Sequence, residues 1–315
     1  MAGLLAAVLT ASLAAGCTTA DGPRDDGRGR ERPPSPGTSE THVNGASVLA
    51  VKIDNVRAAR PPTGLNAADI VYVEQVEAGL SRLMAVYAQQ LPEVIGPVRS
   101  ARESDLELLG QFDRPMLAFS GAQGRLLPLI GSAPLQAKPP EKAADAYFRG
   151  TDRPSPHNLY LRPGRLMSSA PGTSVLTTGF RFGAAPAGGR PETSRTVHFP
   201  AARFDFTWSK SQDRWLVAMD GNAARTTDGK RVAAGTVVVQ YVKVRRSDFH
   251  DSVGNYTPYT ETVGSGRAQV LRDGHAYDVN WKRPKATDGT TFTTDDGKPM
   301  NFQHGQVWVV FAKAS

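Results

Sequence analysis

Residues 69–89 read DIVYVEQVEAGLSRLMAVYAQ, and this stretch decides the fold of the first half of the chain. Apolar side chains at successive positions over 70–73 predict a strand that is buried on both faces. Gly79 marks a turn, and the apolar run over 82–89 predicts a second strand that pairs with the first. One long helix over 67–90 is the alternative, and Gly79 and the β-branched content disfavour it.

The neighbouring segments complete an N-terminal part of mixed character. The run SVLAVKI at 47–53 predicts a strand, and residues 116–119 predict a short one. Residues 104–112 predict a helix, because Ser104 can cap it and two acidic residues fall in its first turn. We therefore expect a mixed α/β domain over 46–170.

From about residue 172 the sequence pattern changes to strand-like runs separated by Asp-Gly pairs. Asp-Gly between β-rich runs is a strong hairpin signal. We expect a mostly antiparallel β domain over 171–315, and an α+β class for the whole chain. The pairs begin at Asp220, Asp228, Asp273, Asp288 and Asp296, and the runs include 236–244, 269–272, 275–281 and 306–311.

The N-terminus carries a targeting signal. Residues 1–16, MAGLLAAVLTASLAAG, are uncharged and too short as a helix to span the hydrocarbon core. The run ends at Cys17 after small residues, as in a bacterial lipobox, although no basic residue precedes it. We expect a signal peptide over 1–17, with Cys17 lipidated and anchored to the extracytoplasmic face of the cell membrane. A plain signal peptide with an incidental cysteine is the alternative, and residues 18–45 predict a disordered tether.

Composition limits the partners of the chain. Its net charge is +7 and its excess of Lys and Arg lies in the C-terminal half, which favours anionic partners in general. No basic run exceeds residues 243–246, so we expect no nucleic-acid binding. Cys17 is the single cysteine and the histidines show no ligand spacing, so we expect no metal and no cofactor.

Charged residues gather among the apolar strands at 52–105. The motif GPVRSAR at 96–102 displays two arginines with a serine between them before the predicted helix. Paired guanidinium groups and free backbone N–H groups form a receptor for carboxylate or phosphate. Structural salt bridges are the alternative explanation of the cluster. Its members are Lys52, Asp54, Asn55, Arg60, Asp69, Glu74, Glu77, Arg82, Arg99, Ser100, Arg102 and Asp105.

Three residues are candidates for acid/base catalysis. Glu74 and Glu77 invite a glycosidase-like carboxylate pair, but on one continuous strand they face opposite sides. Glu77 with Arg82 across the turn at Gly79 is a simpler ion pair. His157 lies in RPSPHNLY (153–160), where an imidazole could serve as an acid or base, or else it orders a loop together with Asn158.

These segments together resemble the YerB-like family of bacterial lipoproteins, whose domain of unknown function has two parts. The resemblance covers roughly residues 46–312. The similar stretches are KIDN (52–55), ARPPTGLNAADIVYVE (59–74), EAGLSRLMAVY (77–87), IGPVRSARESDLEL (95–108), RPSPHNLY (153–160), GSGRAQVLRDG (264–274), WKRP (281–284) and DDGKPMNFQHGQVWV (295–309).

The resemblance implies an envelope lipoprotein and carries no settled activity. It marks Arg99, Ser100, Arg102, His157 and Asn158 as pocket members. The family usually has a His-Gly-Gly-like element where this chain has FSGAQ (119–123), so any chemistry that depends on that histidine is in doubt here.

The first hypothesis is a binding or accessory module for an anionic or glycan-like ligand, such as a wall polymer or precursor. Its pocket combines Asp54, Arg82, Arg99, Arg102 and His157. The second is an envelope hydrolase or lyase acting on glycan or peptide through Glu74 or Glu77 and His157. A structural partner of membrane proteins is the third. Whether the chain is an enzyme, and its oligomeric state, stay open.

Overall fold

The hairpin expected at 69–89 lies in the middle of the fold. The computed structural model describes residues 46–251 and 254–314. In it, β2 (Ile70–Gln75) pairs with β3 (Ser81–Tyr87) in antiparallel register, and Tyr72 lies opposite Met84. Both strands are buried on both faces, as the sequence predicts.

The largest sheet contains strands from both halves of the chain. Its order is β20-β19-β18-β15-β22-β2-β3-β1-β4-β5, with β9 paired to β19. The join is made by β22, which runs parallel to β2 on one side and to β15 on the other. Besides β2 and β3, the strands are β1 (Leu49–Asp54), β4 (Met116–Ala118), β5 (Gln136–Lys138), β9 (Arg190–Pro191), β15 (Thr236–Val242), β18 (Gly264–Arg272), β19 (His275–Arg283), β20 (Thr291–Thr293) and β22 (Val307–Lys313).

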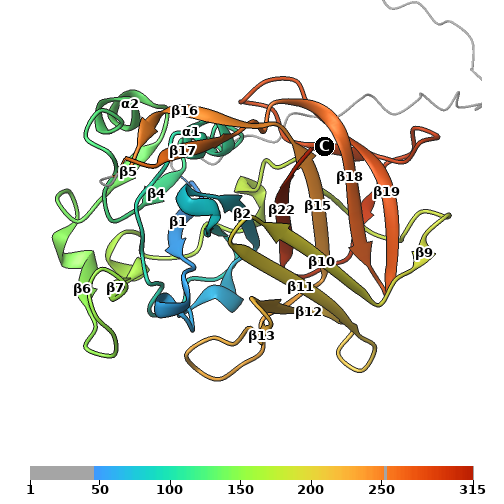
Figure 1. The fold of residues 1–315 in the computed structure, drawn as a ribbon, viewed down its shortest axis with the longest axis horizontal. Helices are drawn as coiled ribbons and strands as arrows, with labels where there is room; N and C mark the ends of the chain where they lie inside the picture. The colour runs from blue at the N-terminus through green and yellow to red at the C-terminus, as the bar shows by residue number, and fades with distance from the viewer. Residues whose placement is uncertain (1–45, 252–253, 315) are drawn as a thin grey trace, which may run out of the picture. The chain divides into compact units, whose positions relative to one another are not determined.

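A second sheet packs on one face of the first and crosses its strands in Figure 1. Its order is β10-β11-β12-β13, and β14 pairs with β12. Phe204, Phe206 and Trp215 of this sheet are fully buried with Trp308 of β22, because alternate residues of each strand point to the shared core. The strands are β10 (Ser194–Phe199), β11 (Ala202–Ser209), β12 (Arg214–Met219), β13 (Asn222–Ala223) and β14 (Ala233–Ala234).

Short helices cover part of the opposite face. Leu108 and Leu109 of α1 pack there with Tyr72 and Met84. The α-helices are α1 (Ser104–Leu109) and α2 (Leu127–Ser132), and the 3₁₀ turns are η1 (Arg57–Ala59), η2 (Leu65–Ala67), η3 (Glu77–Gly79), η4 (Ala144–Ala146), η5 (Pro163–Arg165) and η6 (Thr173–Val175). Within the described ranges, no helix is long and apolar enough to cross a membrane.

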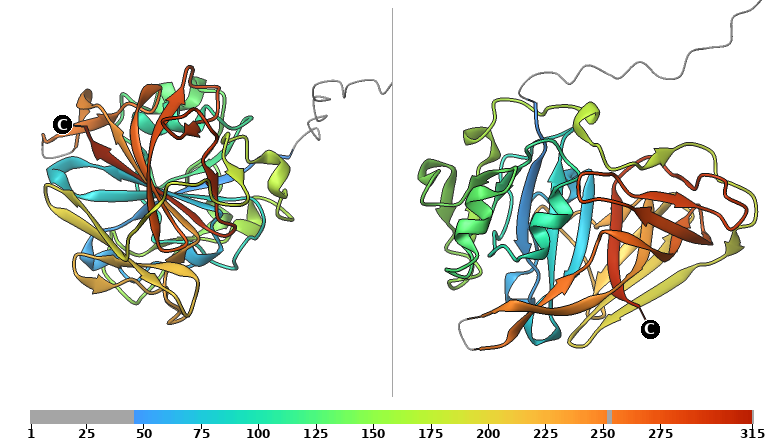
Figure 2. Two further views of the ribbon diagram at one scale, coloured as in Figure 1. Left: turned by 90° about the vertical axis from the view of Figure 1, so that its right-hand side faces the viewer. Right: turned by 90° about the horizontal axis from the view of Figure 1, so that it is seen from above.

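Three two-stranded ribbons complete the described fold. The longest pairs β16 with β17 and reaches from the C-terminal half toward α1, as Figure 2 shows in two further views. The ribbons are β16 (Val244–His250) with β17 (Tyr256–Thr260), β6 (Tyr147–Arg149) with β7 (Leu159–Leu161), and β8 (Arg181–Phe182) with β21 (Asn301–Phe302).

The fold class is β-rich. Strands make up 43% and helices 11% of the described residues, so the expected α/β character of the N-terminal part is not confirmed. The helix expected over 104–112 ends at Leu109, and Ser104 lies inside it rather than at its cap. Glu103 occupies the N-cap position without a side-chain capping bond, and Oδ2 of Asp105 in the first turn accepts the backbone N–H of Arg102 at 2.7 Å.

The Asp-Gly pairs behave as expected in most cases. Asp220 and Asp273 have positive φ of 51° and 49°, as does the glycine after each, and they form the two-residue turns β12–β13 and β18–β19. The pair at Asp288 lies in the longer loop that joins the antiparallel strands β19 and β20, where Gly289 packs against Thr178.

Candidate functional site

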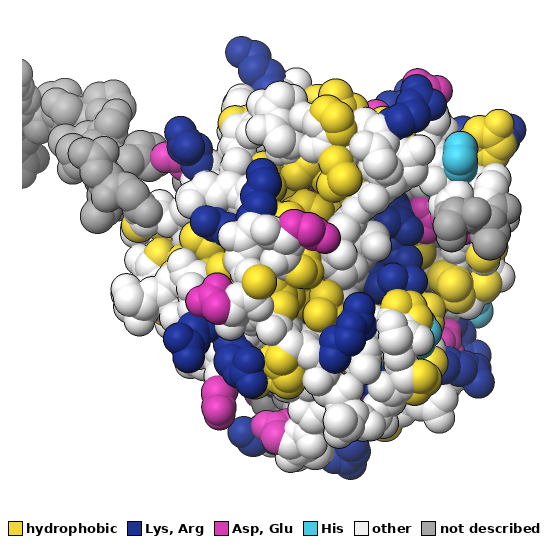
Figure 3. Space-filling model, turned by 90° about the vertical axis from the view of Figure 1, so that its left-hand side faces the viewer, with side chains coloured by type: hydrophobic (Ala, Val, Ile, Leu, Met, Phe, Trp, Pro, Cys, Tyr) yellow, Lys and Arg dark blue, Asp and Glu magenta, His cyan; other side chains and the backbone are white. Residues whose placement is uncertain are grey.

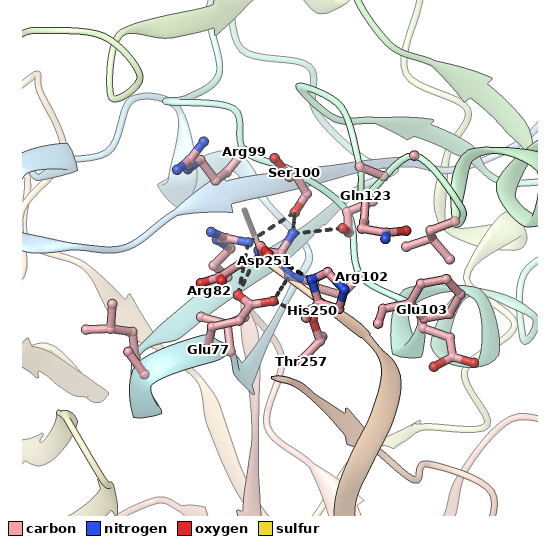
Figure 4. A pocket seen from close by; sticks show the side chains of 18 of the residues that line it. Glu77, Arg82, Arg99, Ser100, Arg102, Glu103, Gln123, His250, Asp251 and Thr257 are labelled. Atoms are coloured by element: carbon pink, nitrogen blue, oxygen red, sulfur yellow. Dashed lines mark hydrogen bonds and ion pairs between the residues drawn. The ribbon is translucent and has the colours of Figure 1, made fainter. Parts of the chain in front are cut away.

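A cavity of roughly 600 Å³ opens where the ends of β2 and β3 meet the segment 99–103 and the β16–β17 ribbon. Arg82 of β3 lines it together with Glu77 of η3. GPVRSAR contributes Arg99, Ser100 and Arg102, so the structure brings together most of the expected ligand-binding residues (Figure 4).

Arg102 and Glu77 form the tightest ion pair of the cavity. Arg102 Nε and Nη2 donate to the two carboxylate oxygens of Glu77 at 2.6 and 2.7 Å. Thr257 of β17 adds a hydrogen bond to the same carboxylate at 2.6 Å. Although burial opposes it, Arg102 holds the pKa of Glu77 below its usual range.

Arg82 is buried but weakly partnered. Its exposed fraction is 9%, and its Nη1 makes one long hydrogen bond of 3.5 Å to the carbonyl of Ser100. In the described chain, Glu77 is the carboxylate within ion-pair distance, at 4.0 Å. Burial, together with Arg102 and Arg99 nearby, lowers the pKa of Arg82 to about 9. A guanidinium has five N–H donors, so most of them face the cavity without a protein partner.

Arg99 stands at the edge of a second group. Its Nε lies 3.2 Å from Oδ2 of Asp54, and the same oxygen lies 2.8 Å from Nδ1 of His157. Asp54 is buried, whereas His157 is partly exposed. His157 therefore joins the site through Asp54 and does not line the cavity itself.

The remaining acidic groups at the cavity have other partners. Glu103 accepts a hydrogen bond from the hydroxyl of Ser247 at 2.6 Å. Asp251 accepts two from Asn255. The lining thus carries three arginines and three carboxylates, and in the described chain the carboxylates within ion-pair distance of the arginines are Glu77 and Asp54.

Glu74 lies apart from the cavity in a buried triad. Lys52 pairs with Glu74 and with Asp105, the latter at 2.6 Å, and all three side chains are almost fully buried. Burial raises the pKa of Glu74 to about 7, although Lys52 opposes the shift. Lys52 is therefore held between two buried carboxyl groups, those of Glu74 and Asp105.

Other members of the predicted cluster have structural roles. Asp69 accepts the backbone N–H of Ala88 and of Gln89 after β3. Asn158 bridges Gly150 and Arg149 in a loop outside the cavity. Arg60 pairs with Asp220 across the two halves of the chain.

Two of the backbone N–H groups in GPVRSAR, those of Ala101 and Arg102, are already engaged in hydrogen bonds. The N–H of Arg102 is bound by Asp105 and that of Ala101 by the carbonyl of Gly121. The arginine side chains therefore carry the cationic character of the site. The sequence also gave no sign of the ribbon residues Phe249, His250 and Thr257, because their distance along the chain leaves no local pattern.

Comparisons with known proteins agree with this architecture. The family model described as "Protein of unknown function (DUF3048) N-terminal domain" matches residues 35–176, and its C-terminal domain matches residues 195–309. The chain belongs to the DUF3048 family. The YerB-like resemblance drawn from the sequence is thereby confirmed.

The chain is similar in sequence and in structure to YerB of Bacillus subtilis. "Putative lipoprotein YerB" of Bacillus subtilis (strain 168) is 24% identical over 308 residues, covering 94% of this chain and 90% of the relative. The crystal structure of YerB protein from Bacillus subtilis has a TM-score of 0.70 at 20% identity, over 88% of this chain and 94% of that chain. The second match shows that the DUF3048 fold is shared. Cys17, the expected lipidation site, lies outside the described residues.

Proposed function

We propose that this DUF3048 protein is a lipoprotein of the bacterial cell envelope that binds an anionic ligand at Arg82, Arg99 and Arg102. Its anchor is a lipid on Cys17, at the extracytoplasmic face of the cell membrane. Two observations support this location: the lipobox-like sequence before Cys17, and the name "Putative lipoprotein YerB" of the Bacillus subtilis relative. An anionic wall polymer or precursor fits that setting.

The weak pairing of Arg82 carries the binding proposal. Burying a charge is costly unless it is paired, so a cation held in place without a full partner destabilises the empty protein. A bound anion would satisfy the free guanidinium donors through charge-assisted hydrogen bonds. Structural arginines such as Arg60 differ, because Asp220 and the carbonyl of Asn55 already bind that guanidinium.

The test compares Arg82→Met with Arg60→Met in the chain that follows Cys17, residues 18–315, which contains every described element. Binding of inorganic phosphate and pyrophosphate is measured by calorimetry, and stability by urea unfolding. We expect Arg82→Met to lose at least tenfold in affinity and to unfold at the same or a higher urea concentration. Arg60→Met should keep the affinity and lose stability. Loss of stability in Arg82→Met with unchanged binding would make Arg82 a structural residue.

The hydrolase or lyase alternative has weaker support. Glu74 is buried in the triad with Lys52, Glu77 is held by Arg102, and His157 is oriented by Asp54. The two glutamates therefore do not face a common cavity. Incubation of the purified protein with cell-wall sacculi tests the alternative. We expect no release of soluble fragments, and fragment release that is lost in His157→Ala would favour the enzyme.

A further inference from the structure

Part of the cavity lining, called here the apolar wall, consists of hydrophobic side chains. Val56, Val76 and Leu80 line it from the N-terminal half, and Leu126 and Phe249 line it from the segment before α2 and from β16. Leu126 and Phe249 are buried, and Val56 and Leu80 are half-buried. A single anion would contact the arginines and leave this wall uncovered.

The size of the cavity also indicates a ligand larger than a single anion. Its volume of roughly 600 Å³ falls in the range of sites that enclose a whole small molecule, about 300–1,000 Å³. A phosphate or carboxylate group occupies only a small part of that space. The ligand therefore has a second portion that extends from the anionic group along the rest of the cavity.

Neutral hydrogen-bonding groups around the cavity are mostly engaged already. The hydroxyl of Thr257 donates to Glu77, and the side-chain oxygen of Gln123 accepts the N–H of Arg125. Ser100 lies 3.5 Å from the hydroxyl of Ser120. A sugar ring would leave its hydroxyls without partners against the apolar wall, and each buried unpaired group weakens binding.

The molecular surface near the cavity continues the mixture of cationic and apolar groups. The helix α2 follows Leu126 directly and exposes Leu127 and Leu129, each at 45%. On the face in Figure 3, Lys and Arg side chains lie next to hydrophobic patches. An extended apolar chain that leaves the cavity beside α2 would meet apolar surface there.

We propose that the ligand is an anionic amphiphile: a phosphate or carboxylate head bound by Arg82 and its neighbours, joined to a hydrocarbon portion that packs on Val56, Leu80 and Phe249. This inference rests on the proposed anion-binding function and narrows its ligand class. A free anion or a glycan phosphate would contact the same arginines but would leave the apolar wall uncovered.

Three phosphate monoesters with the same head test the proposal by calorimetry on residues 18–315: methyl phosphate, n-hexyl phosphate and glucose 6-phosphate. Each buried methylene strengthens binding about fourfold. We expect hexyl phosphate to bind at least tenfold more tightly than methyl phosphate, and glucose 6-phosphate to bind no more tightly than methyl phosphate.

Variants locate the hydrocarbon portion. Val56→Thr and Leu80→Asn should reduce the preference for hexyl over methyl phosphate at least threefold while leaving methyl phosphate affinity within twofold. Val175→Thr, half-buried and outside the cavity lining, is the matched control and should change neither affinity. Circular dichroism confirms that each variant is folded.

Each outcome separates this inference from the binding function. Equal affinities for the three esters, or tightest binding of glucose 6-phosphate, would overturn the amphiphile while leaving anion binding in place. A hexyl preference that persists in Val56→Thr and Leu80→Asn would overturn it too, because the chain would then bind elsewhere. If none of the esters binds the unmodified protein, both proposals fail together.

Discussion

Arg102 donates hydrogen bonds to both carboxylate oxygens of Glu77. Arg82 lies 4.0 Å from the same carboxylate and has no closer carboxylate partner in the described chain. A buried cation, Arg82, and a half-buried one, Arg102, thus share one anion. The negative charge on Glu77 therefore determines how strongly the site attracts an external anion.

Replacing Glu77 with Gln should strengthen phosphate binding and weaken the fold. The variant keeps the shape but removes the charge that competes with the ligand. We expect at least threefold tighter phosphate binding and a loss of about 2 kcal/mol of unfolding free energy, since the arginines then lack their main partner. Glu103→Gln is the control, because Glu103 binds Ser247 and not an arginine. Weaker phosphate binding in Glu77→Gln would contradict the competition.

The buried triad makes Lys52 important for stability. Lys52→Met leaves Glu74 and Asp105 buried without a cation, which should cost about 3–5 kcal/mol in urea unfolding. The double variant Lys52→Met with Glu74→Leu should recover part of the loss, because one buried charge is removed. Lys298→Met removes an exposed ion pair, at 73% side-chain exposure, and should leave the urea midpoint unchanged. A small loss of unfolding free energy in Lys52→Met would show that water solvates the triad.

Glu74 should make stability fall as the pH rises toward neutrality. Its pKa is raised from 4.5 in the unfolded chain to about 7 in the folded one. The stabilisation from the protonated form is therefore complete below about pH 4.5 and is lost as the pH rises through about 7. We expect the difference in unfolding free energy between the unmodified protein and Glu74→Gln to decline by about 1–3 kcal/mol over this window. Urea unfolding at pH 4.5, 6 and 7.5 measures it, and a flat difference would place the proton elsewhere.

The β16–β17 ribbon is held to the N-terminal half through carboxylates. The hydroxyl of Tyr259 donates to Glu107 at 2.9 Å, and Thr257 and Ser247 make similar bonds. Tyr259→Phe should cost about 1–2 kcal/mol, because it leaves a charged acceptor short of one partner. Tyr256→Phe on the same strand is the control, since Tyr256 is 53% exposed. Equal stability of the two variants would mean that the ribbon is attached by packing alone.

The sequence predicted the parts of the fold that depend on near neighbours. The alternation of apolar residues predicted β2 and β3 and their pairing, because one short turn joins them. It did not predict that β22 lies beside β2, since the partners come from opposite ends of the described chain and the pairing leaves no local pattern. It overestimated helix content because short acidic segments such as 104–112 resemble helix starts whatever their length.

For the candidate site, the sequence predicted which residues take part better than it predicted the contacts among them. Arg82, Arg99 and Arg102 converge as expected, because all lie within one compact segment of the fold. The separation of Glu74 from Glu77 follows from where β2 ends: Gln75 closes the strand, and Glu77 begins the turn η3. The apolar wall contributed by Phe249 depends on the path of the ribbon, which no motif encodes.

The position of β22 has a consequence for biogenesis. It is the last strand of the described chain, yet its hydrogen-bonding partners β2 and β15 are both made earlier during synthesis. Until residue 313 has left the ribosome, each of those strands has one open edge, and open edges are prone to pair with other chains. Completion of the sheet therefore waits for β22, and a chain truncated before residue 307 would leave an open edge on both β2 and β15.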